Sequence, residues 1–203
     1  MITTGSKYKI CRRLGPGVYE KCQTQKFVQS QARRSNKKTN KKPKTITGYG
    51  LQLIEKQKIR FSYGIREKQF SNYVKEAVAT KGMAATDKLY EVLESRLDNV
   101  IYRLGIAHTR ALARQMVSHG HFVVNNHKVT VPSHKVKEGD VIKVREGSRG
   151  SILFTGLAQK LKDYSTPAWL TFDAEKLEAK IVGKPKNNDT FLNFNTVLEF
   201  YSR

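Results

Sequence analysis

The sequence is poor in cysteine, in acidic residues and in long apolar runs. Its 203 residues include two cysteines, Cys11 and Cys22, and 17 acidic side chains. With only these two cysteines, a reduced, cytoplasmic setting fits best. No apolar run approaches the roughly 18 residues of a membrane-spanning helix, which argues against a membrane partner. Residues 1–6 lack the pattern of a secretory signal peptide, so we expect none.

Positive charge is abundant instead. The chain holds 38 lysines and arginines and has a net charge of +21, far more than solubility requires. Residues 1–60 carry 16 of the basic side chains and only two acidic ones. This excess predicts a polyanionic partner, and nucleic acid is the leading candidate.

Residues 1–47 are predicted to form a basic N-terminal arm. The segment is poor in apolar side chains, and its basic run at 33–44 cannot bury enough surface to order itself. We expect it to be disordered until phosphates neutralise it; a nuclear address or a DNA-binding tail is the alternative reading of such a run. Its candidate RNA-binding residues are Arg12, Arg13, Arg33, Arg34, Lys37, Lys38, Lys41, Lys42 and Lys44.

Helical periodicity begins near Tyr49. One helix is predicted to run to Tyr63, before Gly64, and a second from about Arg66 to Lys81. The apolar stripe predicted for the second helix consists of Phe70, Tyr73, Val74, Ala77 and Val78. A third helix is predicted to be capped by Thr86 and to bury Leu89, Val92, Leu93 and Leu97. A break near Asp98 ends it. Asp98 is predicted to cap the next helix, which continues to Leu104.

The pattern then changes to a mixed α and β region. Thr109 is predicted to cap a helix that ends at Gly120. The strands expected after it are 122–124, 129–131 and 141–144, with a turn at Asn125-Asn126, where Asn tolerates left-handed backbone angles, and another turn at 137–140. The fold class is therefore α+β, with two helices packed on a small curled sheet.

Two rows of basic side chains follow helical spacing in this region. Arg110, Arg114 and Ser118 lie at i, i+4 and i+8, while Arg96 and Arg103 share a face of the preceding helix. Arginine suits phosphate because its planar fork donates two hydrogen bonds to one group. The candidate RNA-binding residues beyond the arm are Lys56, Lys58, Arg60, Arg66, Arg96, Arg103, Thr109, Arg110, Arg114, Gln115, Ser118, His119, His121 and Lys128.

The segments 95–105, 109–111 and 113–121 resemble the alpha-L RNA-binding domain. Residues 49–53, 55–58 and the ending 199–203 extend the resemblance to the family of bacterial small-subunit ribosomal protein four. The resemblance implies a helical domain formed by residues 48–91 and 171–203, with the alpha-L module, 92–170, inserted into it.

The same resemblance implies the function. Members are structural constituents of the small ribosomal subunit that bind the 5′ domain of its RNA at a multi-helix junction and nucleate assembly. They contact neighbouring ribosomal proteins and lie near the side where mRNA enters the subunit; they influence translational accuracy, and some repress their own operon. We therefore expect no enzymatic activity, no small-molecule substrate, no cofactor and no membrane partner. Bacterial and organellar ribosomes both remain open as the location.

Several departures and alternatives accompany this interpretation. Some members carry a four-cysteine zinc knuckle, but here Tyr8 stands where a first ligand would be and no histidine occurs among the first 100 residues, so no metal site is expected. His119 and His121 could suggest a metal pair, but Gly120 interrupts the helix between them. Arg96-Leu97-Asp98 resembles the core around the catalytic aspartate of some pseudouridine synthases, and a ribosome-rescue factor built on the alpha-L module is a further alternative.

Overall fold

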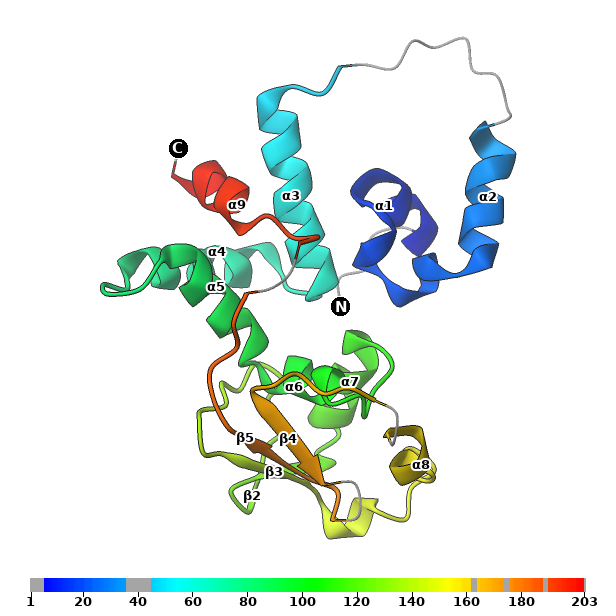
Figure 1. Cartoon of the computed structure of the whole chain (residues 1–203), viewed down its shortest axis with the longest axis vertical. Helices are drawn as coiled ribbons and strands as arrows, with labels where there is room; N and C mark the ends of the chain where they lie inside the picture. Colours follow the sequence, from blue (N-terminus) through cyan, green and yellow to red (C-terminus); the bar gives the residue numbers. More distant parts are fainter. Residues whose placement is uncertain (1–5, 36–44, 162–163, 174–175, 188–189, 203) are drawn as a thin grey trace. The chain divides into compact units, whose positions relative to one another are not determined.

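The computed structural model describes residues 6–35, 45–161, 164–173, 176–187 and 190–202 (Figure 1). The chain divides into two compact units. The first comprises Met1–Leu89 and Asn188–Arg203, and the second comprises Tyr90–Asn187. The chain passes from the first unit to the second within helix α5, Ala85–Glu94.

The first unit is helical. Its long helices are α3 (Gly48–Ser62), whose N-cap is Thr47, and α4 (Glu67–Ala79), whose Phe70, Tyr73, Val74 and Ala77 are buried. Val78 was predicted to join this stripe but is 64% exposed. The elements of this unit besides α5 are α1 (Lys7–Leu14), the 3-10 turns Pro16–Val18 and Glu20–Gln23, α2 (Gln25–Ser35), α3 (Gly48–Ser62), α4 (Glu67–Ala79) and α9 (Phe194–Tyr201).

The N-terminal segment folds, contrary to the prediction of a disordered arm. Residues 6–35 form α1, two 3-10 turns and α2 around a small core, which consists of Cys11, Leu14, Val18, Cys22 and Phe27. These apolar residues are few, and partners from remote parts of the chain, such as Ile54 and Phe191, pack against them. The basic run continues into residues 36–44, which lie outside the described residues.

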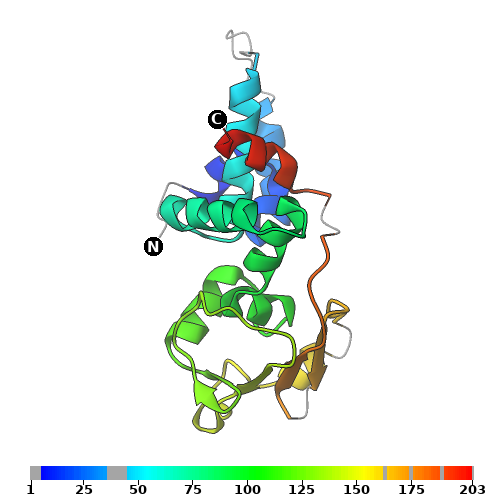
Figure 2. The same ribbon diagram turned by 90° about the vertical axis from the view of Figure 1, so that its left-hand side faces the viewer.

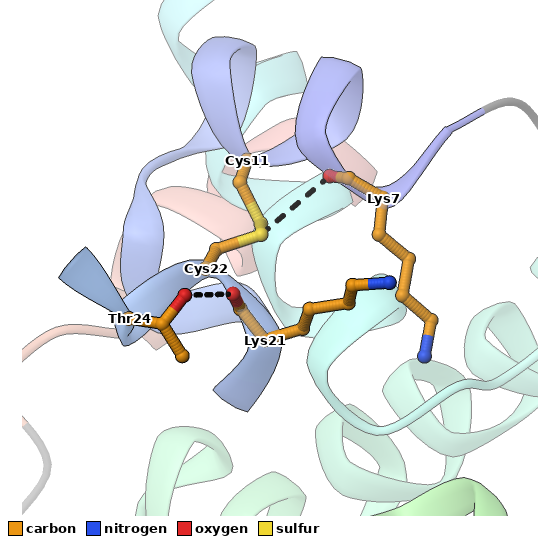
Figure 3. Close-up of a disulfide and its surroundings, with 5 residues drawn as sticks. All are labelled: Lys7, Cys11, Lys21, Cys22 and Thr24. Atoms are coloured by element: carbon orange, nitrogen blue, oxygen red, sulfur yellow. Dashed lines mark hydrogen bonds between the residues drawn. A yellow bond between two sulfur atoms is a disulfide. The ribbon is translucent and has the colours of Figure 1, made fainter. Parts of the chain in front are cut away.

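A disulfide joins Cys11 of α1 to Cys22 (Figure 3). Both cysteines are 1% exposed, and the carbonyl oxygen of Lys7 lies 3.7 Å from the Cys22 sulfur. The sequence analysis inferred a reducing setting from the small number of cysteines and did not predict that these two are bonded to each other. The bond links the first helix to the second 3-10 turn and supplies a constraint that this small core needs.

The C-terminal segment returns to the first unit. Helix α9 packs on α3, as two views of the molecule show (Figures 1 and 2). Upstream of α9, the ring of Phe191 covers the turn after α1, where a Cβ on Gly17 would lie 3.0 Å from the ring. Phe191 and the apolar residues of α9 thus find their partners in the early helices, whereas Leu170, Ala179 and Ile181 pack in the second unit.

The second unit places two helices against an antiparallel sheet of five strands in the order β2-β1-β3-β5-β4. Alternate residues of its strands are buried, among them Phe122, Val124, Ile142 and Val144. These side chains pack with Leu97, Val100, Ile101, Ala113, Met116 and Val117 of the helices. The elements are α6 (Leu97–Arg103), α7 (Arg110–Ser118), β1 (Phe122–Val124), β2 (His127–Lys128), β3 (Val141–Val144), the 3-10 turn Glu146–Ser148, α8 (Leu157–Leu161), β4 (Leu170–Asp173) and β5 (Glu178–Ile181).

Local details confirm some predictions and correct others. Asn125 and Asn126 have φ of 48° and 67° and close the β1–β2 hairpin, as predicted. The second strand is not 129–131, however, because the two-residue turn pairs Val124 with His127. Thr86 lies inside α5 rather than at its cap. The sheet also continues beyond the expected insert, 92–170, with β4 and β5.

No helix within the described ranges has the length and apolar character needed to span a membrane.

We predict that loss of the disulfide loosens the N-terminal core. Reduction, or Cys11→Ser with Cys22→Ser, removes a cross-link that closes a short loop, which is worth about 3 kcal/mol. The amide of Gly15, which donates to the Cys11 carbonyl, should then exchange its hydrogen about 100-fold faster. Fluorescence of Trp169, the single tryptophan, which lies in the second unit, should report unchanged stability there. Equal Gly15 exchange with and without reductant would contradict the prediction.

Candidate nucleic-acid interface

Asp98, in the first turn of α6, joins two arginines inside the second unit. Its side chain is 4% exposed. Arg96 donates to it from Nε at 3.0 Å and from Nη2 at 2.8 Å. Arg114 of α7 donates from Nε at 2.8 Å and from Nη2 at 2.7 Å. One carboxylate therefore ties the start of α6 to α7.

Glu94, the last residue of α5, forms a second junction. Its side chain is 1% exposed and accepts two bonds of 2.8 Å from Arg103. Asn99 donates to it at 3.0 Å, and the amide oxygen of Asn99 accepts from Arg110 Nε at 2.8 Å. The Arg110 guanidinium also lies 4.3 Å from the ring centre of Tyr102. These contacts connect α5, α6 and α7.

The two junctions leave an excess of positive charge. In the contacts described, four guanidiniums surround two carboxylates, so cations outnumber carboxylates. A buried carboxylate requires such partners, because an isolated charge in the interior is strongly unfavourable. The Arg103 and Arg114 side chains are 28% and 33% exposed. They therefore reach the surface in orientations that are already fixed.

Helix α7 presents the outer part of this arrangement. The Thr109 hydroxyl caps the helix by accepting from the Leu112 amide at 3.1 Å, as predicted. Ala113, Met116 and Val117 are buried, so the opposite side of the helix faces outward. We define the α7 face as Arg110, Arg114, Gln115, Ser118, His119 and Lys128; all are exposed or half-exposed.

Two residues of the α7 face lie around the end of the helix. Gly120 ends α7 with φ of 73°, a left-handed conformation that suits glycine. The stem of Lys128 covers the point where a Cβ on Gly120 would lie, so the lysine passes close to the helix end. His119, the C-cap, is exposed. Both sites were predicted from the sequence as RNA contacts.

His121 follows the same turn and is half-buried. Its Nδ1 lies 3.0 Å from the Ser148 hydroxyl, and its ring centre lies 6.0 Å from that of His119. Burial, followed by the positive charges of His119 and Arg145, lowers the pKa of His121 below its ordinary value. Among the residues that the structure describes, no three His, Cys, Asp or Glu side chains gather as metal ligands.

Arg96 and Lys56 do not lie where the sequence analysis placed them. Arg96 is 3% exposed and serves Asp98, so the prediction that it forms part of a basic surface was wrong. Lys56 is 7% exposed; it lies 2.8 Å from Glu67 and 4.4 Å from the ring centre of Phe200. The spacing that placed these side chains on polar faces did not reveal their acidic partners.

Of the other predicted RNA-binding residues of the first unit, some form ion pairs or hydrogen bonds within the unit and others are exposed. Lys58 pairs with Glu55 at 2.6 Å, and Arg60 pairs with Glu67 at 3.3 Å. Arg12 donates to the Ser30 hydroxyl at 3.2 Å. The exposed ones are Arg13, Arg33, Arg34 and Arg66. Lys37, Lys38, Lys41, Lys42 and Lys44 lie outside the described residues.

Glu67 is the centre of the first unit's ion pairs. Burial alone would raise its pKa, but hydrogen bonds from Lys56 and Tyr201 and the charges of Lys56 and Arg60 outweigh burial and lower it. Burial and the bond to Glu67 raise the pKa of Tyr201. These cations therefore stabilise the contact between α4 and α9 within their own unit.

The environment of Asp98 also argues against the alternative that Asp98 is the catalytic aspartate of a pseudouridine synthase. The prediction that Asp98 caps α6 was wrong, because Arg96 occupies the N-cap and Asp98 lies within the first turn. Because it is buried and held by two guanidiniums, it is not available to attack a nucleoside.

Glu94 was not among the functional residues predicted from the sequence. The signal was present, since an acidic residue between buried Leu93 and Leu97 must find a buried cation. Nothing in the local spacing, however, identified Arg103, nine residues further on, as that cation.

Comparison with known proteins covers nearly the whole chain. Residues 3–94 match the model of the ribosomal protein S4/S9 N-terminal domain, and residues 95–142 match that of the S4 domain. Small ribosomal subunit protein uS4 of Acetivibrio thermocellus is 42% identical over 205 residues, which cover 98% of each chain. Protein uS4A of Alkaliphilus oremlandii is 43% identical over 200 residues and 96% of each chain, and uS4 of Solidesulfovibrio magneticus is 40% identical over 205 residues and 98% of each.

We predict that Asp98→Asn destabilises the second unit. A neutral amide cannot balance two guanidiniums, and Arg96 would keep a buried charge without its carboxylate, which should cost about 3–5 kcal/mol. Urea unfolding followed by Trp169 fluorescence measures this loss. The control is Asp173→Asn, since the Asp173 side chain is 46% exposed and its pair with Lys176, at 3.8 Å, is exposed as well. Loss of this charge should cost about 0–1 kcal/mol. Equal unfolding midpoints for the two variants would contradict the proposed role of Asp98.

We also predict a pH dependence that arises from His121. Its pKa is lowered by folding, so below the ordinary value of 6.5 the unfolded chain binds the proton more readily than the folded chain. The contribution of neutral His121 to the free energy of unfolding is fully present above pH 6.5, and it decreases as the pH falls below 6.5. The measurement is the free energy of unfolding by Trp169 fluorescence between about pH 7.5 and 5.5. His121→Gln should have a smaller pH dependence than the wild type, and the same slope in both would contradict the assignment.

Proposed function

Because the chain belongs to the uS4 family of small ribosomal subunit proteins, we propose that its second unit holds small-subunit ribosomal RNA against the α7 face and Arg103 of α6. As a member of this family the chain is a structural protein and not an enzyme. The observation that carries the proposal is the anchoring of surface arginines by buried carboxylates, Asp98 for Arg114 and Glu94 for Arg103.

Anchored arginines suit a folded RNA better than mobile lysines do. Guanidinium forks hydrogen-bond phosphates with defined geometry, so they position the backbone of the RNA. A side chain that is fixed in the free protein loses less conformational entropy on binding. Arg103 and Arg114 meet both conditions, because each is partly exposed and already bonded on its inner side.

The net charge of +21 adds an electrostatic contribution to RNA affinity that does not depend on the RNA sequence. Each neutralised phosphate releases counterions, so affinity should fall steeply with salt. Exposed cations of the first unit, such as Arg13, Arg33 and Arg34, would contribute in this way, together with the lysines of residues 37–44.

The proposal extends to the biological setting that the family resemblance implies. The RNA site would be a multi-helix junction of the 5′ domain, and binding there would nucleate subunit assembly. Neighbouring ribosomal proteins, and mRNA near the side where it enters the subunit, would be further partners, with effects on accuracy and repression of the protein's own operon. The module responsible would be the second unit, Tyr90–Asn187.

We predict that Arg110→Gln with Arg114→Gln weakens binding to small-subunit ribosomal RNA. Loss of two phosphate contacts should reduce the slope of log affinity against log salt by about two. Filter binding at a series of salt concentrations measures both affinity and slope.

The matched control is Lys180→Gln with Lys186→Gln, which removes the same charge from exposed residues outside the α7 face. It should leave the slope nearly unchanged. Trp169 fluorescence checks that each variant is folded at the assay temperature, because Arg114 also bonds Asp98. The assignment fails if both double variants lose the same affinity.

A further inference from the structure

Two histidines lie at the C-terminal end of α7, which is the part of this helix that attracts phosphate least. The last carbonyl groups of a helix carry partial negative charge, so a phosphate there needs nearby cations. Lys128, whose stem passes over Gly120, and Arg145 supply permanent charge near this end. His119 and His121 add to it only when they are protonated. The protonation of these rings therefore changes how strongly this end of α7 attracts RNA.

The ring of His121 is held on its inner side. Its Nδ1 lies 3.0 Å from the hydroxyl of Ser148, which is 3% exposed, and its centre lies 5.8 Å from that of Phe154. The backbone ties the same turn to the histidine, because the Arg145 amide donates to the His121 carbonyl at 2.9 Å. The Ser148 amide in turn donates to the Arg145 carbonyl at 2.8 Å. Since Nδ1 is engaged with a buried group, Nε2 is the ring nitrogen that is left to meet a ligand.

A hydroxyl is a partner that suits a histidine which gains and loses a proton. The Ser148 hydroxyl donates to Nδ1 when the ring is neutral with its proton on Nε2, and after rotation it accepts from Nδ1–H when the ring is protonated. A group that only donates, such as an ammonium, would fit only the neutral ring. The buried contact therefore survives the uptake of a proton by His121.

The charges around His121 favour its neutral form in the free protein. Burial, followed by the charges of His119 and Arg145, lowers its pKa below the ordinary value. A phosphate beside the ring opposes these charges and favours the protonated form. The charged or titratable groups of the neighbouring segments are His119 at the end of α7, Lys128 of β2, and Arg145, Glu146 and Arg149 in and around the 3-10 turn after β3. The acidic one, Glu146, is exposed.

We propose that binding of RNA beside the α7 face is coupled to the uptake of one proton by His121, which Ser148 positions. The protonated ring donates from Nε2 to a phosphate oxygen, and its Nδ1–H donates to the Ser148 hydroxyl. RNA affinity therefore rises as the pH falls, because a proton that binds together with the RNA contributes at most about tenfold in affinity per pH unit. The inference rests on the proposed function and adds a pH regulation of the same site.

The test is the binding of the full chain to intact small-subunit ribosomal RNA at constant salt. Filter binding should give an affinity about fivefold higher at about pH 6 than at about pH 7.5. Titration calorimetry in buffers of different ionisation enthalpy counts the protons taken up. His121→Gln should lower both the pH dependence and the proton uptake. His134→Gln is the matched control, because His134 is also half-buried in the second unit and lies outside the α7 face. It should behave as the wild type does.

Ser148→Ala tests whether the hydroxyl positions the ring. At about pH 6 it should weaken RNA binding in the wild-type background and have no effect on affinity in the His121→Gln background. Equal losses in the two backgrounds would make the role of Ser148 merely structural and overturn its assignment. Trp169 fluorescence checks that each variant is folded at each pH. If His121→Gln is unfolded, His121→Asn replaces it, because its amide oxygen still accepts from a hydroxyl.

The remaining outcomes separate this inference from the proposed function. RNA binding by the wild type with no proton uptake and no pH dependence would overturn the coupling and leave the proposed function standing. The same proton uptake in His121→Gln as in the wild type would overturn the assignment to His121. Absence of RNA binding at every pH would instead overturn the proposed function, and the coupling with it.

Discussion

The second unit depends on the pairing of two buried carboxylates with arginines that reach the surface. Glu94 and Asp98 cannot remain charged in the interior without cations, and the cations that they recruit come from three separate segments around α6 and α7. The hydrogen bonds that stabilise the buried carboxylates of Glu94 and Asp98 therefore also orient the side chains of Arg103 and Arg114. Stability of the fold and geometry of the surface follow from the same interactions, because neither carboxylate can be removed without disturbing both.

The first unit uses its charges differently. Lys56 and Arg60 turn toward Glu67, and Tyr201 of α9 completes the group with a bond of 2.7 Å. Here the cations hold one helix against another. Composition alone does not distinguish such a structural lysine from one that meets RNA, since both belong to the same basic total. The difference lies in whether an acidic residue from another part of the chain lies within reach.

Local signals explain what the sequence predicted well. The start of α7 follows from its cap, Thr109, and the ends of α3 and α7 follow from Gly64 and Gly120. Each of these residues acts on the backbone within a few residues. The buried stripe of α7 follows from helical periodicity. The folded N-terminal segment could not be predicted in this way, because its core depends on a disulfide and on Phe191 from the far end of the chain. The burial of Arg96 also depends on remote segments, since Arg96 forms a β-bridge with Lys135 and Arg114 of α7 binds the same carboxylate, Asp98.

Because α9 packs on α3, the first unit needs a segment that follows the whole of the second unit in the sequence. Translation proceeds from the N-terminus, and domains generally fold as units as they emerge. Residues 90–187 are all available before α9 has been made. The second unit can therefore close its core and set its guanidiniums while α3 still lacks its partner. A nascent chain would thus be able to form its arginine surface before its helical unit is complete.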